Sequence, residues 1–367
     1  IDRDTFLKTL SHANGIIEKK ATLPILSNIL IEAKESFVKI TATDLDIIYS
    51  EVAPIQELKK MGSTTTSANI LYDILRKLKP GSKVELSLQN TSKLKVVSDN
   101  SKFNLLCIAP DNFPLSNEDN GQKTFDIPSQ KLLKVLNKTK ISISNDETRH
   151  YLNGIYLHKT KLENKIFLSG VATDSHRLSS SSLEIDADTD FEAIILPKKT
   201  IFQLIYLLEQ NTNVIKISNS KSKIRFEMGK GILISKVIDG RFPDYSKVVP
   251  QDNDKILEVN SNEFKNSIER VTTVSSDRKE GLKMNISKDL LQFSVNNPNS
   301  GEGTESIKVK FNSNDMSISF NSKYLVDIAS QIESDFIVIN LKDAGSPVLI
   351  KDLSDKNSFH VVMPMKI

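Results

Sequence analysis

Apolar residues recur with the period of an amphipathic helix near the start of each third of the chain. These positions are Phe6, Leu10 and Ala13, then Leu132 and Leu136, then Phe264, Ile268 and Val271. A second helical set, Leu71, Ile74, Leu75 and Leu78, recurs as Ile201, Leu204, Ile205 and Leu208, and again as Leu325, Ile328, Ala329 and Ile332. Strand-like alternation follows each set, at Leu94 and Val96, Ile224 and Phe226, and Val348 and Ile350. Offsets of 130 and 124 residues relate the second helices, so the pattern predicts three copies of one domain.

The repeat predicts an α+β fold, because each copy combines two amphipathic helices with about eight short strands that are separated by Gly, Pro and Asn turns. The polar stretches 117–124 and 249–255 have no apolar periodicity and are interpreted as linkers. We therefore expect three domains, at residues 1–118, 124–249 and 251–367.

The composition narrows the class of protein. A chain of 367 residues with 38% hydrophobic and 26% charged side chains is typical of a soluble protein with two or three domains. No apolar run approaches the ~20 residues of a membrane span, and the start IDRDTFLKTL lacks a signal-peptide pattern, so we expect a cytoplasmic protein. Cys107 is the single cysteine and the histidines show no metal-ligand spacing, so we expect no disulfide, no metal and no cofactor. The histidines are His12, His150, His158, His176 and His360.

The net charge of +3 is unevenly distributed. Residues 121–250 carry 20 basic and 14 acidic side chains, against 15 and 15 in residues 1–120. In PSQKLLKVLNKTK, 128–140, three lysines at i, i+3 and i+7 (Lys131, Lys134, Lys138) take a different side from the leucines. One such helix is typical of an ordinary solvated face. Basic residues repeated on the other candidate helices instead favour a polyanion as partner, although no motif for recognising bases is present. These residues are Lys8, Arg76, Lys77, Lys198, Lys199, Lys265 and Arg270.

The stretch ATDSHRL, 172–178, places Asp174, Ser175 and His176 side by side, which are the residue types of a hydrolytic triad. Neighbouring residues of an extended chain point to opposite faces, so these three cannot form a relay among themselves. No G-x-S-x-G elbow is present, and Ala-Thr-Asp recurs at 42–44 without the Ser-His pair. EMGKGIL, 227–233, lacks the P-loop spacing and is interpreted as a hairpin turn. A serine hydrolase using Ser175 and His176 is the disfavoured alternative.

Five segments together resemble one known family. TLPILSN (22–28), TRHYLNGI (148–155), ATDSHRL, DGRFPDY (239–245) and VVMPMKI (361–367) are similar to segments of the β sliding clamp of bacterial DNA polymerase III, in order through all three repeats. The resemblance implies three DNA-clamp domains per chain, with helices lining a hole and antiparallel sheets outside, closed as a head-to-tail homodimeric ring. It implies a processivity factor of DNA replication that is not an enzyme.

The resemblance also implies the partners. These are double-stranded DNA that is encircled without sequence reading, the replicative DNA polymerase, an ATP-dependent clamp loader, other clamp-motif proteins and a second copy of the chain. No membrane partner is expected. A three-domain nucleic-acid-binding protein that never closes into a ring is a further alternative, which would differ in its oligomeric mass.

Three groups of site residues follow from the same resemblance. The pocket for partner peptides falls on Arg149, Leu152, Thr173, Ser175, His176, Arg177, Leu178, Pro243, Lys247, Val248, Asn321, Tyr324, Val361, Met363, Pro364 and Met365. The positions for DNA fall on Lys20, Asn69, Asp146, His150, Tyr151, Lys198 and Lys199. The dimer interface falls on Phe103 and Leu105 against Thr273 and Val274. Apart from the resemblance, Leu178, Val361 and Met363 are typical core residues.

Several positions depart from the family pattern. Ser175 stands where glycine is usual, Lys366 replaces an arginine, and Gly345 and Pro347 occupy a stretch that often carries Val and Ser. Asn69 replaces an arginine and Asp146 a polar residue, which weakens the expectation of DNA contacts there. The acidic stretch expected near 299–305 is reduced to Glu302 and Glu305, so the interface is expected to depend more on apolar contact and strand pairing.

Overall fold

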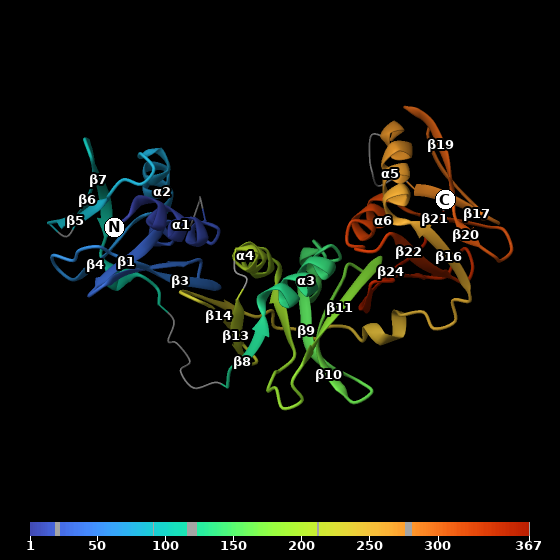
Figure 1. The fold of residues 1–367 in the computed structure, drawn as a ribbon, viewed down its shortest axis with the longest axis horizontal. Coiled ribbons are helices and arrows are strands. Elements are labelled where there is room, and N and C mark those ends of the chain that lie inside the picture. The colour runs from blue at the N-terminus through green and yellow to red at the C-terminus, as the bar shows by residue number, and fades with distance from the viewer. Residues whose placement is uncertain (19–22, 91, 116–122, 211–212, 276–280, 367) are drawn as a thin grey trace. The chain divides into compact units, whose positions relative to one another are not determined.

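The structure is a computed structural model that describes residues 1–18, 23–90, 92–115, 123–210, 213–275 and 281–366 (Figure 1). The chain folds into two compact units. The first unit contains Ile1–Gln130, Thr189–Glu192 and Phe202–Val237, and the second contains Lys131–Asp188, Ala193–Ile201 and Ile238–Ile367. The central part of the chain therefore contributes to both units.

The α-helices form where the apolar periodicity predicts them. They are α1 (Arg3–Asn14), α2 (Ala68–Lys77), α3 (Ser129–Lys140), α4 (Lys198–Glu209), α5 (Ser261–Val271) and α6 (Ser322–Ala329). Side-chain caps begin several of them, because an Ncap oxygen accepts an otherwise unpaired backbone N–H. Asp2 caps α1 through Thr5 N at 2.8 Å, and Asn260 caps α5 through Glu263 N at 3.0 Å. Ile332 was expected in the last helix, but it lies beyond the end of α6, which closes at Ala329.

One antiparallel sheet of 11 strands runs through the described part of the first unit. In spatial order its strands are β5 (Glu85–Gln89), β6 (Lys93–Ser98), β7 (Ser101–Ile108), β4 (Gly62–Ser67), β1 (Asn28–Lys34), β2 (Phe37–Thr43), β3 (Ile47–Pro54), β15 (Gly231–Lys236), β14 (Lys223–Met228), β13 (Val214–Asn219) and β8 (Phe125–Pro128). Pairing of β3 with β15, from Glu51↔Gly231 to Ile47↔Ser235, joins the strands of the first repeat to those of the second.

The second unit holds two sheets among its described residues. The larger has the order β12 (Ile194–Pro197), β9 (Gly154–Leu162), β10 (Lys165–Thr173), β11 (Arg177–Ile185), β24 (Asp355–Val362), β23 (Val348–Asp352), β22 (Phe336–Leu341), β16 (Lys255–Asn260) and β20 (Lys310–Phe311). The smaller has the order β19 (Gly301–Lys308), β18 (Leu290–Asn297), β17 (Gly281–Ser287) and β21 (Met316–Asn321). Here β11 of the second repeat pairs with β24 of the third, from Arg177↔Val362 to Ser181↔Ser358.

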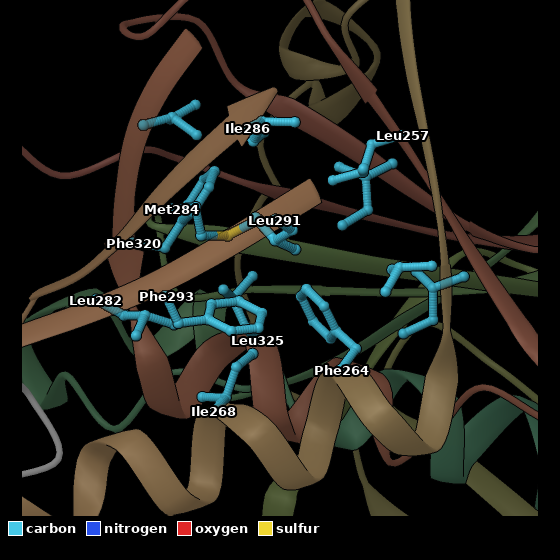
Figure 2. Close-up of a cluster of buried hydrophobic side chains, with 14 of the residues drawn as sticks. Leu257, Phe264, Ile268, Leu282, Met284, Ile286, Leu291, Phe293, Phe320 and Leu325 are labelled. Atoms are coloured by element: carbon cyan, nitrogen blue, oxygen red, sulfur yellow. The ribbon is translucent and has the colours of Figure 1, made fainter. Parts of the chain in front are cut away.

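The third repeat shows why the apolar pattern produces this fold. In Figure 2, Phe264 and Ile268 of α5 lie against side chains of the sheet, including Met284 and Phe293. Each of these four side chains is at most 1% exposed. Burying a side chain of this size contributes roughly 1.5–3 kcal/mol, so the helical stripe holds α5 on the sheet. In Figure 1 the helices α5 and α6 of this repeat lie side by side.

The predicted α+β class and the three-fold repeat are confirmed. The paired strand positions are also buried, as at Val96, Phe226 and Ile350, which are at most 1% exposed. Both large sheets cross the expected linkers, so neither compact unit coincides with a repeat. The repeat limits at 1–118, 124–249 and 251–367 stay a prediction.

Candidate functional site

The stretch ATDSHRL forms a tight turn between β10 and β11. The Asp174 carboxylate accepts the backbone N–H groups of His176 at 3.0 Å and Arg177 at 2.9 Å, and Thr173 Oγ1 accepts Ser175 N at 3.1 Å. Ser175 takes a left-handed backbone with φ 76°. Asp174 is thus a turn-forming aspartate. These contacts disagree with a relay through Ser175 and His176.

The earlier Ala-Thr-Asp at 42–44 builds the same turn in the first unit. Asp44 Oδ1 accepts the N–H groups of Asp46 at 3.0 Å and Ile47 at 2.7 Å, and Thr43 Oγ1 accepts Leu45 N at 3.0 Å. Leu45 has φ 80°, matching Ser175. The recurring tripeptide therefore encodes a hairpin turn, which accounts for its presence without a Ser-His pair.

Arg149 is held at the rim of this turn by two partners. Its Nε donates to Asp146 Oδ2 at 2.8 Å, and its Nη1 donates to Ser175 Oγ at 2.6 Å. Asp146 caps the 3₁₀ turn η3 (Glu147–Leu152). Hydrogen bonds from Thr148 and then from Arg149 lower the pKa of Asp146 to about 2. The two hydrogen bonds that link Asp146, Arg149 and Ser175 connect η3 with the β10–β11 turn, and this linked group is called the rim strap below.

Arg177 provides a buried cation beside the strap. Its side chain is 7% exposed, with Nε 3.1 Å from Asp174 Oδ2 and Nη1 2.7 Å from Asp327 Oδ2. The guanidinium carbon lies 4.3 Å from the centre of the Tyr324 ring. A buried guanidinium needs such paired and stacked neighbours, so Arg177 connects β11 rigidly to α6.

Three expected pocket residues share one apolar cluster. Leu152, Leu178 and Val361 are buried together with Val171, Ile195, Phe242 and Leu349. Leu178 and Val361 are directly paired across β11 and β24. They come from the second and third repeats, so the sheet junction between these repeats forms the floor of the candidate pocket.

The end of the chain supplies an exposed rim. Met363 N donates to His176 O at 2.8 Å, and Met365 N donates to Ser319 O at 2.7 Å, while their side chains are 40% and 37% exposed. Pro364 lies between them and is partly exposed. Asn321 is the N-cap of α6 and accepts Lys323 N at 3.0 Å. Flexible, polarisable methionine side chains beside a buried floor suit contact with varied apolar partners.

The segment with Pro243, Lys247 and Val248 is attached to the same sheet through aromatic rings. Tyr156 of β9 stacks on Phe242 with centroids 4.9 Å apart and on His158 with centroids 4.4 Å apart. His158 Nε2 also shares a hydrogen bond of 3.0 Å with the Tyr245 hydroxyl, and burial lowers the pKa of His158 to about 4. Pro243, Lys247 and Val248 are themselves exposed, and Lys247 Nζ lies 3.3 Å from Asp244. The supporting role of Tyr156 and His158 was not predicted from the sequence.

The positions expected to contact DNA are only partly brought together. In the second unit, Lys198 Nζ donates to Asn145 Oδ1, next to Asp146, and His150 Nε2 bonds Asp239 O at 3.1 Å. The His150 and Tyr151 rings meet edge to face at 5.9 Å. Lys199 is exposed in the first turn of α4. Asn69, half-buried in α2, belongs to the first unit, and Lys20 lies outside the described residues.

The residues expected at a dimer interface lie on strand β7 and in the 3₁₀ turn η5 (Thr272–Val274). Phe103 and Leu105 belong to β7, which pairs with β6 and reaches β4 only at Ile108 and Cys107. In the described part of the second unit, β19 is the end strand of its sheet, and Val274 packs partly on the core of the third repeat. Thr273 is exposed beside Val274. Glu305 of β19 is already paired with Arg270, whose Nε lies 3.0 Å from Oε2.

The cationic-face interpretation of the α3 lysines is wrong for two of the three residues. Lys138 is buried, with Nζ 3.2 Å from Asp352 and 3.1 Å from Asp355, and Lys134 Nζ lies 2.9 Å from Glu333. Lys131 alone is exposed. The sequence held a signal for this, because Lys138 follows the buried Val135 by three residues and so lies on the apolar stripe.

A surface depression also occurs among the described residues, lined by none of the candidate site residues named above. A depression of about 410 Å³ lies on the smaller sheet of the second unit and is lined by Asn285, Ile286, Ser287, Leu290, Gln292, Asp315, Met316 and Ser317. Its lining mixes polar and apolar side chains and contains one charged residue, Asp315, so the candidate site remains at the β11–β24 junction.

Neither a membrane-crossing helix nor a metal-binding cluster occurs among the described residues. None of the helices in this part of the chain is both long and apolar enough to cross a membrane. Over the same ranges, no three His, Cys, Asp or Glu side chains are grouped closely enough to hold a metal ion.

The fold and the site together define a three-domain clamp. Its three repeats share antiparallel sheets, and the apolar floor of the candidate pocket lies where the second repeat meets the third. Comparison with known protein families gives the particular one. Residues 1–117 match the N-terminal domain, 126–244 the central domain and 246–366 the C-terminal domain of the DNA polymerase III beta subunit. The chain belongs to this family.

Relatives agree along the whole chain. A beta sliding clamp of Caulobacter vibrioides is 33% identical and that of Escherichia coli K12 is 30% identical, each covering 100% of this chain and 99% of the relative. A crystal structure of the Caulobacter crescentus clamp superposes with a TM-score of 0.97 at 33% identity, covering 100% of this chain and 98% of that one. The sliding clamp of Bartonella birtlesii bound to griselimycin gives 0.96 at 38% identity, with the same coverage.

Proposed function

We propose that this protein is the sliding clamp of a bacterial replicative DNA polymerase. Two chains close head to tail into a ring of six domains around duplex DNA, and the ring tethers the polymerase to its template. The observation that carries the proposal is the ordered match of three clamp domains over nearly the whole chain. The serine hydrolase alternative has no support in the geometry of Asp174.

Ring closure is supported by the strand edges of the two units. The outer edge of β7 and the end strand β19 each present backbone groups that a second copy can pair, and Leu106 of β7 is 77% exposed. A head-to-tail contact of this kind is heterologous, and it gives a ring only if the rotation closes. We place Phe103 and Leu105 of one copy against Thr273 and Val274 of the next.

Partner peptides are proposed to bind at the β11–β24 junction. Leu152, Leu178 and Val361 supply the apolar floor, while Met363 and Met365 form an adaptable rim. The rim strap and Arg177 supply fixed polar groups that orient a bound segment. A shared site of this kind allows the polymerase, the clamp loader and other clamp-motif proteins to compete.

DNA is proposed to be held without sequence reading. Lys198, Lys199 and His150 offer charge and hydrogen bonds suited to phosphate oxygens, and phosphate contacts position a protein without selecting bases. Asp146 contributes no attraction, because it is an anion already paired with Arg149. We further propose that the protein is not an enzyme, acts in the cytoplasm and is opened by a separate ATP-dependent loader.

The test is retention on circular DNA. The protein loaded on a nicked circle should survive gel filtration at salt that strips contact-bound proteins, because phosphate binding weakens roughly tenfold per tenfold rise in salt for each contact, whereas a ring leaves only by opening. Linearising the circle should then release the protein from the free ends. Loss from the intact circle at moderate salt, or persistence on linear DNA with free ends, would contradict encirclement.

A further inference from the structure

A buried ion cluster joins α3 to the hairpin of β23 and β24. Lys138 of α3 is 2% exposed, and its Nζ lies 3.2 Å from Asp352 Oδ2 and 3.1 Å from Asp355 Oδ2. Glu333 Oε1 is 3.6 Å away, and Lys134 Nζ reaches both Glu333 at 2.9 Å and Asp355 at 3.1 Å. The two lysines come from the second repeat and the three carboxylates from the third.

The two aspartates, Asp352 and Asp355, are held in their charged form. Burial opposes ionisation of Asp352, but N–H groups of Glu333 at 2.8 Å and Ser354 at 2.9 Å donate to it and hold its pKa far below the usual range. Burial likewise opposes ionisation of Asp355, and Lys138 lowers its pKa. A buried ammonium is tolerated only with such compensation. Removal of Lys138 takes away the ion pair of Asp352 and one of the two lysines that pair with Asp355.

The cluster lies where the regular pairing of β23 with β24 ends. Asp352 ends β23 and Asp355 begins β24, and the pairing of these two strands shifts between Lys351 and Asp352. Regular pairing of β24 with β23 runs from Val348↔Val362 to Lys351↔Phe359, and with β11 from Arg177↔Val362 to Ser181↔Ser358, so these ladders fix the strand from Ser358 onward. The first residues of β24 lie beyond this regular pairing, because an irregularity of this kind disrupts a ladder locally. Lys138 contacts both ends of this connection and so holds the start of β24 against α3.

The far end of β24 carries part of the candidate pocket. Val361 and Val362 pair with Leu178 and Arg177 of β11, and Met363 continues from there. Between the two ends, His360 is buried and its Nδ1 shares a hydrogen bond of 2.8 Å with Ser179 Oγ. Val362 lies seven positions along the strand from Asp355, roughly 23 Å at about 3.3 Å per residue. A displacement at the cluster is thus transmitted along one continuous strand.

We propose that Lys138 is a positioning residue for partner binding: by ion-pairing with Asp352 and Asp355 across the junction of the second and third repeats, it sets the placement of β24 on which the peptide pocket depends. The inference rests on the proposed function. Lys138 does not touch the peptide and acts only through β24.

The experiment compares Lys138→Met with Lys131→Met in the full chain. Affinity for a synthetic peptide that carries the clamp-binding segment of the organism's own replicative polymerase is measured by calorimetry, well below the melting temperature of each variant. K138M should weaken binding at least tenfold, and Lys138→Arg, which keeps the cation, should recover most of it. K131M changes an exposed lysine of the same helix and should stay within twofold of the unaltered protein.

Two further variants separate positioning from general stability. Ile286→Ala removes buried core volume from β17, in the smaller sheet and outside the ion cluster, so it should lower the melting temperature and leave peptide affinity unchanged. Asp355→Asn combined with K138M should lose no more affinity than the weaker-binding single variant, because two groups acting as one unit are not additive.

Each outcome has a defined meaning. If the unaltered protein does not bind the peptide, the proposed function of the pocket fails. If it binds and K138M binds equally well, if I286A weakens binding as much as K138M, or if the K138M and D355N losses add, the positioning role of Lys138 is overturned.

Discussion

Leu45 and Ser175 carry side chains in a left-handed backbone, at φ 80° and 76°, in equivalent turns of two repeats. Such a conformation costs an L-residue roughly 1–2 kcal/mol, and glycine avoids most of the cost. The two differ in compensation, because Ser175 accepts a hydrogen bond from Arg149 and Leu45 is an exposed apolar side chain. Comparison of the two turns therefore tests how much the hydrogen bond from Arg149 stabilises the turn at Ser175.

Glycine at these two positions should have unequal effects. Leu45→Gly should stabilise the protein by about 0.5–1 kcal/mol, since strain is relieved and little contact is lost. Ser175→Gly should gain less, because the rim strap loses its acceptor, a hydrogen bond worth about 0.5–1.5 kcal/mol. Urea midpoints of the two variants would measure the difference. A larger gain for S175G than for L45G would show that the strap contributes nothing.

Two buried histidines make the second unit sensitive to acid. Burial lowers the pKa of His158 to about 4 and that of His360 to about 3, so both are neutral in the folded protein near neutral pH. In the unfolded chain both histidines bind a proton below their ordinary pKa of about 6.5. The free energy of unfolding is therefore fully present above about pH 6.5 and falls as the pH drops toward the lower pKa values of the folded protein.

The expected loss is steep. With two protons bound only by the unfolded state, the free energy of unfolding should fall by up to about 2.7 kcal/mol per pH unit between about pH 6 and 4.5. His158→Gln should reduce that slope by about half. Urea midpoints measured across this range would test it, and an unchanged slope in H158Q would contradict the buried neutral histidine.

Several residue roles could not be read from the sequence. The helical period correctly placed Phe264 and Leu132 in the core, because one stripe of a helix must face its sheet. It placed Lys134 and Lys138 toward a polyanion, because the carboxylates that pair with them lie about 200 residues away in sequence. The helical period could place Lys138 on the apolar stripe, but it could not identify the carboxylates that pair with it.

At the scale of elements, β24 contributes both to the junction of two repeats and to the proposed peptide pocket. It joins two repeats through β11, carries Val361 in the pocket floor and leads into the methionine rim. The alternation of the sequence predicted strands with the correct period, but strand partners across repeats were not specified by it. The pocket residues came from family resemblance, and their role in binding stays a prediction.

Removal of residues 363–367 should abolish partner binding without opening the dimer. The deletion takes away Met363 and Met365 together with their backbone bonds to His176 and Ser319. Apolar anchors at binding sites are worth a few kcal/mol each, so affinity for a short peptide should fall roughly a hundredfold or more. Calorimetry would measure it, with sedimentation as the control for the dimer. The double change His176→Ala and Leu178→Ala should act in the same direction, and unchanged affinity in both would exclude the site.

At the scale of the whole molecule, the incompletely paired strand β7 and the end strand β19 predict self-association. The chain should sediment at twice its own mass at micromolar concentration, because two chains of three domains complete a ring of six. Leu106→Lys should shift the population toward monomer, since it places a charge on an exposed apolar edge residue. A monomer in the unaltered protein, or a dimer insensitive to L106K, would argue against this edge as the contact.

The division of the middle repeat between two sheets limits how the protein can be dissected. A fragment cut at 124 and 249 would lose β3, which pairs with β15, and β24, which pairs with β11. Two unpaired strand edges would then be exposed in one small protein. Such edges recruit other chains, so the excised repeat would aggregate or exchange strands with its copies. A fragment that keeps the proposed peptide pocket must instead begin near residue 124 and run to the end of the chain, because it then contains both β11 and β24. Its remaining open edge, at β15, would require a polar substitution.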